Sequence, residues 1–306
     1  MMCHMADILV FSDTIPDARP LIEGGCTTPL ILLVTNRYDY GIEGPDYEAY
    51  TNIMKHAANQ SHIWWVVNNP YESYYIRMRG VPLPEERLLQ LRPAGVCLLP
   101  PASLNSPERP RVALVQPTGP EHLENTFIAP WIKEQGLTEF VRMYRQHYGG
   151  PTVLARHRGV LSVPYQTSVM KMYEGLTAGA VFIIPSPTFF VKLLGQHNNS
   201  MMVMCCRDLI ERHPNDWRQY FDWYHEDFIQ AHLMYDSWDE LRDIIRDRER
   251  SMELIEERRY TGRLAMRRSR QRTLDGYSKL YRAVSQQACD GARKPDVLSQ
   301  GYEPRG

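Results

Sequence analysis

The sequence predicts an α/β fold made of two Rossmann-like domains that face each other across a cleft, with helices at the C-terminal end. Three observations lead to this prediction. Short apolar runs, each long enough for one buried strand, alternate with segments of helical periodicity over residues 30–185. Polar loops follow several of these runs, and residues 100–110 contain four prolines that mark a linker. Such alternation of strands and helices is typical of doubly wound parallel sheets.

Length and composition are sufficient for two domains. The chain has 306 residues, of which 43% are hydrophobic and 10% aromatic, so each half can bury its own core. We expect a flexible lead-in over residues 1–28 and an N-terminal Rossmann-like domain over 29–110. A C-terminal Rossmann-like domain should follow over 111–265, and a helix with a tail should complete the chain over 266–306.

Charge and cysteine content limit the possible partners and the location. A formal net charge of −1 gives no overall attraction to nucleic acid, so we expect no nucleic-acid partner. No apolar run approaches the length of about 18 residues that a transmembrane helix needs, and no basic lead precedes an apolar N-terminal core. The six cysteines show no metal-type spacing, and the adjacent Cys205 and Cys206 indicate buried thiols, so we expect the thiols of the chain to be reduced. These features predict a cytoplasmic protein.

The first half contains three expected strands with helices between them. The first strand is 30–34, and a helix over 46–59 leads to a second strand over 63–67. A helix begins near Pro70, since proline is tolerated in a first turn, and a third strand is expected around 96–99. Strand, helix, strand, helix and strand make one Rossmann-like half.

The second half repeats this pattern and ends in helices. We expect strands and helices that alternate along the chain, over residues 112–115 (strand), 137–148 (helix), 151–157 (helix), 160–163 (strand), 166–178 (helix), 181–184 (strand) and 187–194 (helix). Ser237 and Glu240 form a capping box that starts a further helix. The charged segment 239–284 is helical, and its arginine cluster at 267–272 indicates a solvated face.

The strand–helix–strand unit over residues 160–184 carries the strongest functional signal. Ligands of such folds bind beyond the carboxyl ends of the strands. Here the helix would begin with the polar residues Gln166, Thr167 and Ser168, whose amides suit an anion. Lys171 follows one turn later, and Glu174 stands in an otherwise apolar stretch that Gly179 ends.

Four residues separate Glu174 from Gly179, and an apolar strand and Pro185-Ser186 follow. This segment resembles the donor-binding half of glycosyltransferases with two Rossmann-like domains (the GT-B-like superfamily). The resemblance implies that the acidic residue binds the ribose of a nucleotide sugar and that the helix start faces the diphosphate. The retaining branch of that family often has a second Glu eight residues earlier, where this chain has Gln166. Looser similarity extends over most of residues 29–285.

The resemblance implies a donor site and a catalytic base. The expected donor-binding residues, all at or near the central unit, are Arg156, Arg158, Tyr165, Gln166, Ser168, Lys171 and Glu174. Removal of a proton from the acceptor hydroxyl needs a base, for which Asp39 after the first strand and Glu72 after the second are candidates. Carboxylates at such positions also commonly cap helices, and Arg156, Arg158 and Tyr165 have purely structural alternatives.

The sequence therefore predicts a glycosyltransferase that moves a sugar from a nucleotide-sugar donor to a glycan or a small-molecule acceptor. Because no Asp-x-Asp occurs, we expect no metal and no cofactor besides the donor itself. A nucleotide-sugar epimerase and a catalytically inactive binding scaffold remain alternatives. The glycine motifs of P-loop kinases, nicotinamide dehydrogenases and α/β-hydrolases are absent from the expected strand ends.

Overall fold

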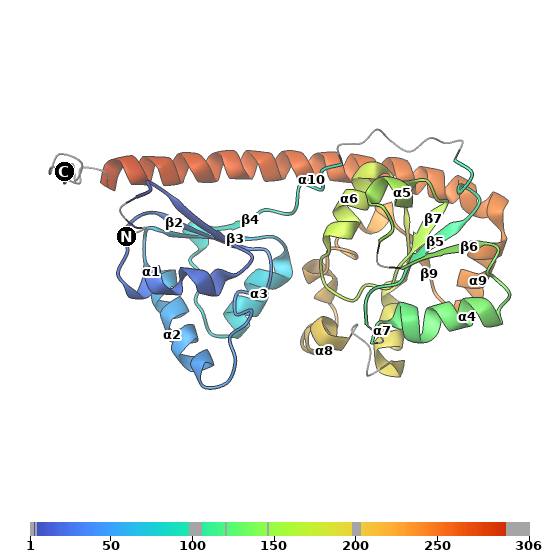
Figure 1. Cartoon of the computed structure of the whole chain (residues 1–306), viewed down its shortest axis with the longest axis horizontal. Helices are drawn as coiled ribbons and strands as arrows, with labels where there is room; N and C mark the ends of the chain where they lie inside the picture. Colours follow the sequence, from blue (N-terminus) through green and yellow to red (C-terminus); the bar gives the residue numbers. More distant parts are fainter. Residues whose placement is uncertain are drawn as a thin grey trace, which may run out of the picture. The chain divides into compact units, whose positions relative to one another are not determined.

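The computed structural model describes residues 3, 5–97, 106–119, 121–145, 147–197 and 203–291 (Figure 1). The described chain forms two compact units. The first unit takes its residues from Met1–Asn68, Glu72–Leu91 and Leu274–Gly306, and the second from Asn69–Tyr71 and Arg92–Thr273. Helix α10 (Arg248–Gly291) therefore contributes its first part to the second unit and its last part to the first.

The first unit is built on a four-stranded parallel sheet with the strand order β1-β2-β3-β4. Its strands are β1 (Leu9–Ser12), β2 (Leu30–Val34), β3 (Ile63–Val67) and β4 (Leu88–Gln90). Its helices are α1 (Arg19–Glu23), α2 (Asp46–Asn59) and α3 (Pro70–Met78), with short 3-10 turns at Ile15–Ala18 and Glu85–Arg87. Parallel strands joined by helices of this kind form a Rossmann-like unit.

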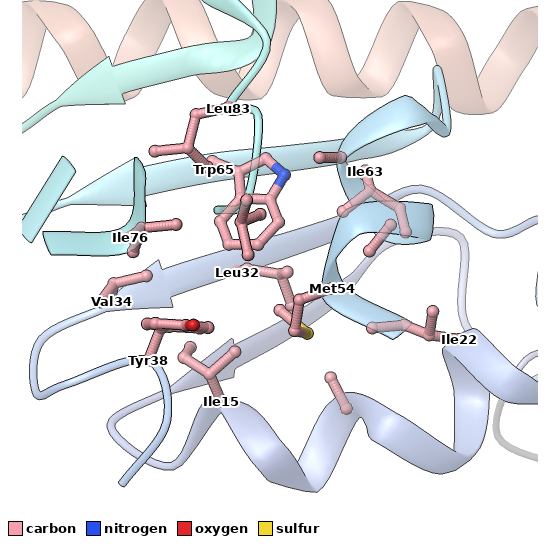
Figure 2. Packing of buried hydrophobic residues seen from close by; sticks show 14 of the residues in the cluster. Ile15, Ile22, Leu32, Val34, Tyr38, Met54, Ile63, Trp65, Ile76 and Leu83 are labelled. Carbon is pink, nitrogen blue, oxygen red and sulfur yellow. The ribbon is translucent and has the colours of Figure 1, made fainter. Parts of the chain in front are cut away.

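Alternate residues of β2 and β3 pack into two cores, one on each face of the sheet. Figure 2 shows the larger core, in which Leu32 of β2 and Trp65 of β3 lie with Met54 of α2. The opposite face carries Ile31 and Val66, which pack against Leu280 and Val284 of α10. Because successive side chains of a strand point to opposite faces, a continuous apolar run such as Leu30–Val34 is what a sheet covered on both sides requires.

The second unit is built on a five-stranded parallel sheet with the strand order β6-β5-β7-β8-β9. Its strands are β5 (Val112–Val115), β6 (Val141–Tyr144), β7 (Gly159–Leu161), β8 (Phe182–Pro185) and β9 (Leu233–Tyr235). Its helices are the π-helix η4 (Glu124–Ile128), α4 (Ala129–Glu134), α5 (Pro151–Ala155), α6 (Met170–Ala178), α7 (Pro187–Gln196), α8 (Val203–Arg212), α9 (Trp238–Arg246) and the first part of α10. Two 3-10 turns lie at Trp217–Tyr220 and Ile229–Ala231.

The residues expected to form a flexible lead-in instead belong to the first unit. Strand β1 pairs with β2 over four residues, and Ile15, Ala18 and Ile22 are buried in the larger core. The mixed composition of this segment hid a short edge strand and its covering helix. The second unit also begins earlier than residue 111 and ends later than residue 265.

A disulfide bond joins Cys3 to Cys26, so the expectation that all thiols are reduced is wrong for this pair. That expectation was also an argument for a cytoplasmic location, because disulfides are rare in the cytosol. The side chains of Cys205 and Cys206 lie outside the described residues. Within the part of the chain that is described, no helix combines the length and the apolar character that crossing a membrane demands.

Two further segments differ from the prediction. The sequence predicts a strand around 96–99, but the strand that follows β3 is β4 (Leu88–Gln90), which pairs with β3. Residues 96 and 97 form no strand, and 98–99 lie outside the described residues. Residues 141–144, expected within a helix, form the edge strand β6 and pair with β5. In both places, pairing with a neighbouring strand decides the conformation where local periodicity is ambiguous.

Candidate functional site

The loops that follow β5 and β7 leave the second sheet at the same edge. These two strands are parallel neighbours, with Leu114 opposite Leu161, so their carboxyl ends lie side by side. The loop after β5 leads to η4, and the loop after β7 leads to α6. This is the edge at which ligands bind in open α/β sheets.

Glu124, the first residue of η4, is an almost fully buried carboxyl group at this edge. Its exposed fraction is 1%, and its Oε1 accepts a hydrogen bond from the Val163 amide at 3.4 Å. Burial raises the pKa of Glu124, while the positive charge of Lys171 acts in the opposite direction. No local sequence signal marks this residue, because a glutamate between His122 and Asn125 has the appearance of an ordinary first-turn residue.

Lys171 is the second residue of α6 and carries the positive charge that acts most strongly on Glu124. Its side chain is half-buried, and it forms no hydrogen bond or salt bridge with any residue that the structure describes. Burial lowers the pKa of Lys171, and the charge of Glu124 opposes that shift. No side chain caps the helix at Val169. The Met172 amide donates to the Val169 carbonyl at 3.1 Å, so the first two amides of the helix, those of Met170 and Lys171, are available together with the ammonium group.

The helix starts later than expected, because α6 begins at Met170 and not at Gln166. The preceding residues are not helical, with a bend at Gln166 and Thr167, and other residues of the same unit hold them. The Thr167 carbonyl accepts a hydrogen bond from the Asp222 amide at 2.9 Å, and Ser168 Oγ lies 3.1 Å from the Tyr173 hydroxyl. Gln166 is exposed. The amides expected at the anion site therefore shift by four residues.

Glu174 lies one turn beyond Lys171, which places both side chains on one face of α6. It is half-buried and makes no hydrogen bond with another described residue. Burial raises the pKa of Tyr148, and the negative charge of Glu174 adds to that shift. The ring of Tyr165 packs edge-on against His122, with 5.3 Å between the ring centroids.

The two arginines expected near the donor lie at the other edge of the sheet. Both precede β7 in the chain, whereas the carboxyl edge follows it. Arg158 is fully buried and donates hydrogen bonds to the Ile245 carbonyl and to Ser251 Oγ, each at 2.6 Å. Burial lowers its pKa to about 10. Arg156 is exposed at the C-terminal cap of α5. The structure therefore separates both from Lys171 and makes Arg158 a structural residue.

The two carboxylates expected as bases both belong to the carboxyl edge of the first sheet. Asp39 is buried and accepts hydrogen bonds from the hydroxyls of Tyr47 and Tyr75, each at 3.0 Å. Both bonds reach Oδ2, and Oδ1 has no partner among the described residues. Glu72 is 2% exposed and forms a salt bridge with Arg37.

A buried charge network supports the segment that leads into the candidate site. Arg92 donates to Asp222 Oδ1 and to Asp227 Oδ2, each at 2.9 Å. The second oxygen of Asp222 accepts the hydroxyl of Tyr173, which itself contacts Ser168. Both oxygens of a fully buried carboxylate are thus satisfied, as such a group requires, and the segment before α6 is fixed in place.

No three His, Cys, Asp or Glu side chains of the described chain are arranged to hold a metal ion.

Neither a family model nor a curated protein sequence matches this chain. Among solved structures, the crystal structure of TarM superposes with a TM-score of 0.52 at 11% sequence identity, and the match covers 90% of this chain and 54% of TarM. A mutant of S. aureus TarM, in complex with Fondaparinux, alpha-GlcNAc-glycerol and UDP, gives a TM-score of 0.48 at 12% identity over 87% of this chain and 54% of that one. The pneumococcal O-GlcNAc transferase GtfA, in complex with UDP and GlcNAc, gives a TM-score of 0.43 at 9% identity, and the match covers 87% of this chain and 59% of GtfA.

The likeness to TarM confirms the predicted α/β fold with two parallel-sheet, Rossmann-like domains. This chain spans about half the length of that protein. At this identity the likeness concerns the fold, and the chemistry has to be argued from the site.

Proposed function

We propose that this protein is a glycosyltransferase that moves a sugar from a nucleotide-sugar donor to a glycan or small-molecule acceptor without a metal ion. The observation that carries the proposal is Lys171, a half-buried ammonium group without a partner among the described residues, in the first turn of α6. An uncapped helix start and an unpaired cation together favour the binding of a diphosphate group. The same edge of a parallel sheet is where nucleotides bind in this class of fold.

The donor residues divide into three roles. The Lys171 ammonium group and the amides of Met170 and Lys171 bind the diphosphate and stabilise the charge that develops on it as the sugar leaves. Glu174, on the same face of the helix, accepts hydrogen bonds from the ribose hydroxyls. Tyr165 borders the site, and its packing against His122 gives it a fixed ring face for the base or the sugar. Gln166 and Ser168 border the site as neighbours of Tyr165.

The acceptor hydroxyl loses its proton to Asp39 in this proposal. Two tyrosine hydroxyls hold Oδ2 of this carboxylate, and Oδ1 is left for an incoming hydroxyl. A base that other groups hold in one orientation is what proton transfer needs. Glu72, the other candidate, is engaged with Arg37, which makes it the weaker choice.

One observation favours a second candidate function, a binding scaffold without activity. Gln166 stands where the retaining branch of the resembling family often has a glutamate, and its side chain is exposed. A scaffold would still bind the nucleotide through Lys171 and Glu174, and it would turn over no donor. An epimerase would convert the donor in the absence of any acceptor.

A thermal-shift panel of nucleoside diphosphates and nucleotide sugars tests the proposal. A ligand present far above its Kd raises the stability by a few kcal/mol, so one nucleotide family should raise the Tm of the wild type. Glu174→Ala should lose that shift, and Glu134→Ala, an exposed glutamate of α4, should keep it. If no nucleotide shifts the folded wild-type protein, the proposal is wrong. Donor turnover with and without acceptor then separates the transferase, the epimerase and the scaffold.

A further inference from the structure

The proposed mechanism gives Glu124 no role, although the burial of its carboxyl group, which is 1% exposed, needs an explanation. Glu124 forms no salt bridge with any described residue, and its bond from the Val163 amide is long at 3.4 Å. An ionised carboxylate in such surroundings is costly unless a charge compensates it. The group that Glu124 faces is therefore decisive for its protonation.

Titratable groups face Glu124 from each neighbouring element. Lys171 of α6 is the cation, and His122 lies two residues before Glu124, ahead of η4. Tyr165 after β7 and Tyr235 of β9 both lie in the field of Glu124. The two phenols are neutral at physiological pH, because the ordinary pKa of tyrosine is about 10 and burial raises the pKa of each further. Lys171 is thus the main charge that favours the ionised form of Glu124.

We propose that an anion bound at Lys171 is held together with a proton on Glu124, so that the bound phosphate group contacts both side chains. This inference rests on the proposed function, because it concerns the same diphosphate site. In the free protein Lys171 stabilises the Glu124 carboxylate across the site. A bound diphosphate takes over the ammonium group and adds negative charge beside the carboxylate, which raises the pKa of Glu124 further. The carboxylate then binds one proton from solvent, and the resulting O–H donates a hydrogen bond to a phosphate oxygen.

The linkage has a definite sign. Binding that takes up a proton is favoured at low pH and weakens as the pH rises above the pKa of free Glu124. The affinity should fall by up to tenfold per pH unit in that range. Glu124→Gln, which has the same shape and carries amide hydrogens at every pH, should remove this part of the pH dependence. At high pH the variant should bind more tightly than the wild type.

Isothermal titration calorimetry of the full chain with uridine diphosphate and guanosine diphosphate tests the inference between pH 5.5 and 8.5. Titrations in two buffers with different ionisation enthalpies give the number of protons taken up. The wild type and Glu121→Gln, an exposed control three residues away, should take up more protons than Glu124→Gln. The difference between variants removes the titration of the nucleotide itself.

The outcomes separate the inference from the function on which it rests. Equal proton uptake and equal pH dependence in the wild type and in Glu124→Gln, with nucleotide bound, would overturn the inference and leave the proposed function intact. Absence of binding for both nucleotides in the wild type would overturn both. If Glu124→Gln does not fold, the infrared difference spectrum of the wild type with and without nucleotide decides. A new carbonyl stretch of a protonated carboxylic acid supports the inference, and its absence contradicts it.

Discussion

The hydroxyl of Thr273 donates a hydrogen bond to the carbonyl of Arg92 at 2.9 Å, although 181 residues separate them in the sequence. Arg92 follows directly on the part of the first unit that ends at Leu91, and Thr273 is the last residue of the second unit. The first and the last residue of the long segment of the second unit, Arg92–Thr273, are thus bonded to each other. Arg92 also holds Asp222, so the same bond lies next to the network that supports the segment before α6.

Thr273→Val should destabilise the protein by about 1 kcal/mol or somewhat more, because it leaves the Arg92 carbonyl without its donor in a buried position. For the second unit this corresponds to a decrease in Tm of about 2–4 °C. Thr261→Val is the matched control on the same helix, since the Thr261 hydroxyl is exposed and bonds only to Glu257 of its own helix. Chemical denaturation of both variants checks the difference. Equal stability of the two would show that the bond between Thr273 and Arg92 contributes nothing.

Lys171→Met should weaken the binding of a nucleoside diphosphate by about 10–100-fold, since a hydrogen bond to a charged group contributes about 1.5–3 kcal/mol. In the absence of ligand the variant should have a lower Tm than the wild type, because the buried Glu124 loses the positive charge that favours its carboxylate. Lys192→Met on α7, where the lysine is exposed, should bind like the wild type. Titration calorimetry provides the comparison, and unchanged affinity in Lys171→Met would remove the central residue of the proposed donor site.

His232 should make the protein less stable in mild acid. Its ring lies between Phe182 and Trp223, and burial lowers its pKa to about 3. The unfolded chain has the ordinary histidine pKa of about 6.5, so between these values the unfolded state binds more protons and stability rises with pH. The stability contributed by the neutral His232 is fully present above pH 6.5. As the pH falls below that value, the free energy of unfolding decreases by about 1.4 kcal/mol per pH unit.

His232→Phe removes that titration, and denaturation at pH 6 and at pH 4 measures it. The free energy of unfolding of the variant should rise relative to that of the wild type by roughly 2–3 kcal/mol between pH 6 and pH 4. His56→Phe, at an exposed position of α2, should follow the wild type. A constant difference between His232→Phe and the wild type would contradict the buried neutral histidine.

Two glycines should respond to alanine in opposite ways. A Cβ at Gly175 of α6 would lie 2.8 Å from the ring of Phe182, which is fully buried, so Gly175→Ala should destabilise by about 1–3 kcal/mol. A Cβ at Gly195 of α7 would meet no atom within 4 Å. Gly195→Ala should therefore stabilise by about 0.5–1 kcal/mol through its helix preference. Thermal unfolding of the two variants gives the sign of each effect, and the same sign for both would contradict the packing described for α6.

The disulfide between Cys3 and Cys26 should be detectable and stabilising. The two cysteines are 23 residues apart, and a loop of this size corresponds to about 3 kcal/mol. Alkylation of the denatured, unreduced protein should leave both thiols unmodified in peptide mass spectra, whereas the exposed Cys289 should react. Reduction should lower the Tm of the wild type and leave a Cys3→Ser, Cys26→Ser variant unchanged. Complete alkylation of Cys3 and Cys26 without reduction would show that the bond is not formed.

The strands that are buried on both faces could be predicted from the sequence. Leu30–Val34 and Phe182–Pro185 are continuous apolar runs of strand length, and both occur where the periodicity places them. The start of α6 could not be predicted, because Thr167 and Ser168 would suit a helix N-terminus. Asp222 and Tyr173, which lie later in the chain, bond to these two residues and keep them out of the helix.

Site residues that differ from their neighbours in the sequence could be predicted. Site residues that only the pairing of distant strands brings to the site could not. Lys171 and Glu174 interrupt an apolar stretch, and both lie at the carboxyl edge of the sheet. Arg158 is equally conspicuous in the sequence, yet it lies before its strand and binds the carbonyl of Ile245. Glu124 shows no local signal, since only the pairing of β5 with β7 brings it to Val163.

The last part of α10 has a consequence for the order in which the protein can form during its synthesis. Leu280 and Val284 cover the face of the first sheet that carries Ile31 and Val66, and they follow the whole of the second unit in the chain. At about 5–20 residues per second, the ribosome needs about 10–40 s to make the intervening segment. During this time the nascent first sheet presents one apolar face to its surroundings or to a chaperone. The N-terminal unit therefore completes its fold last, in contrast to the usual order of synthesis.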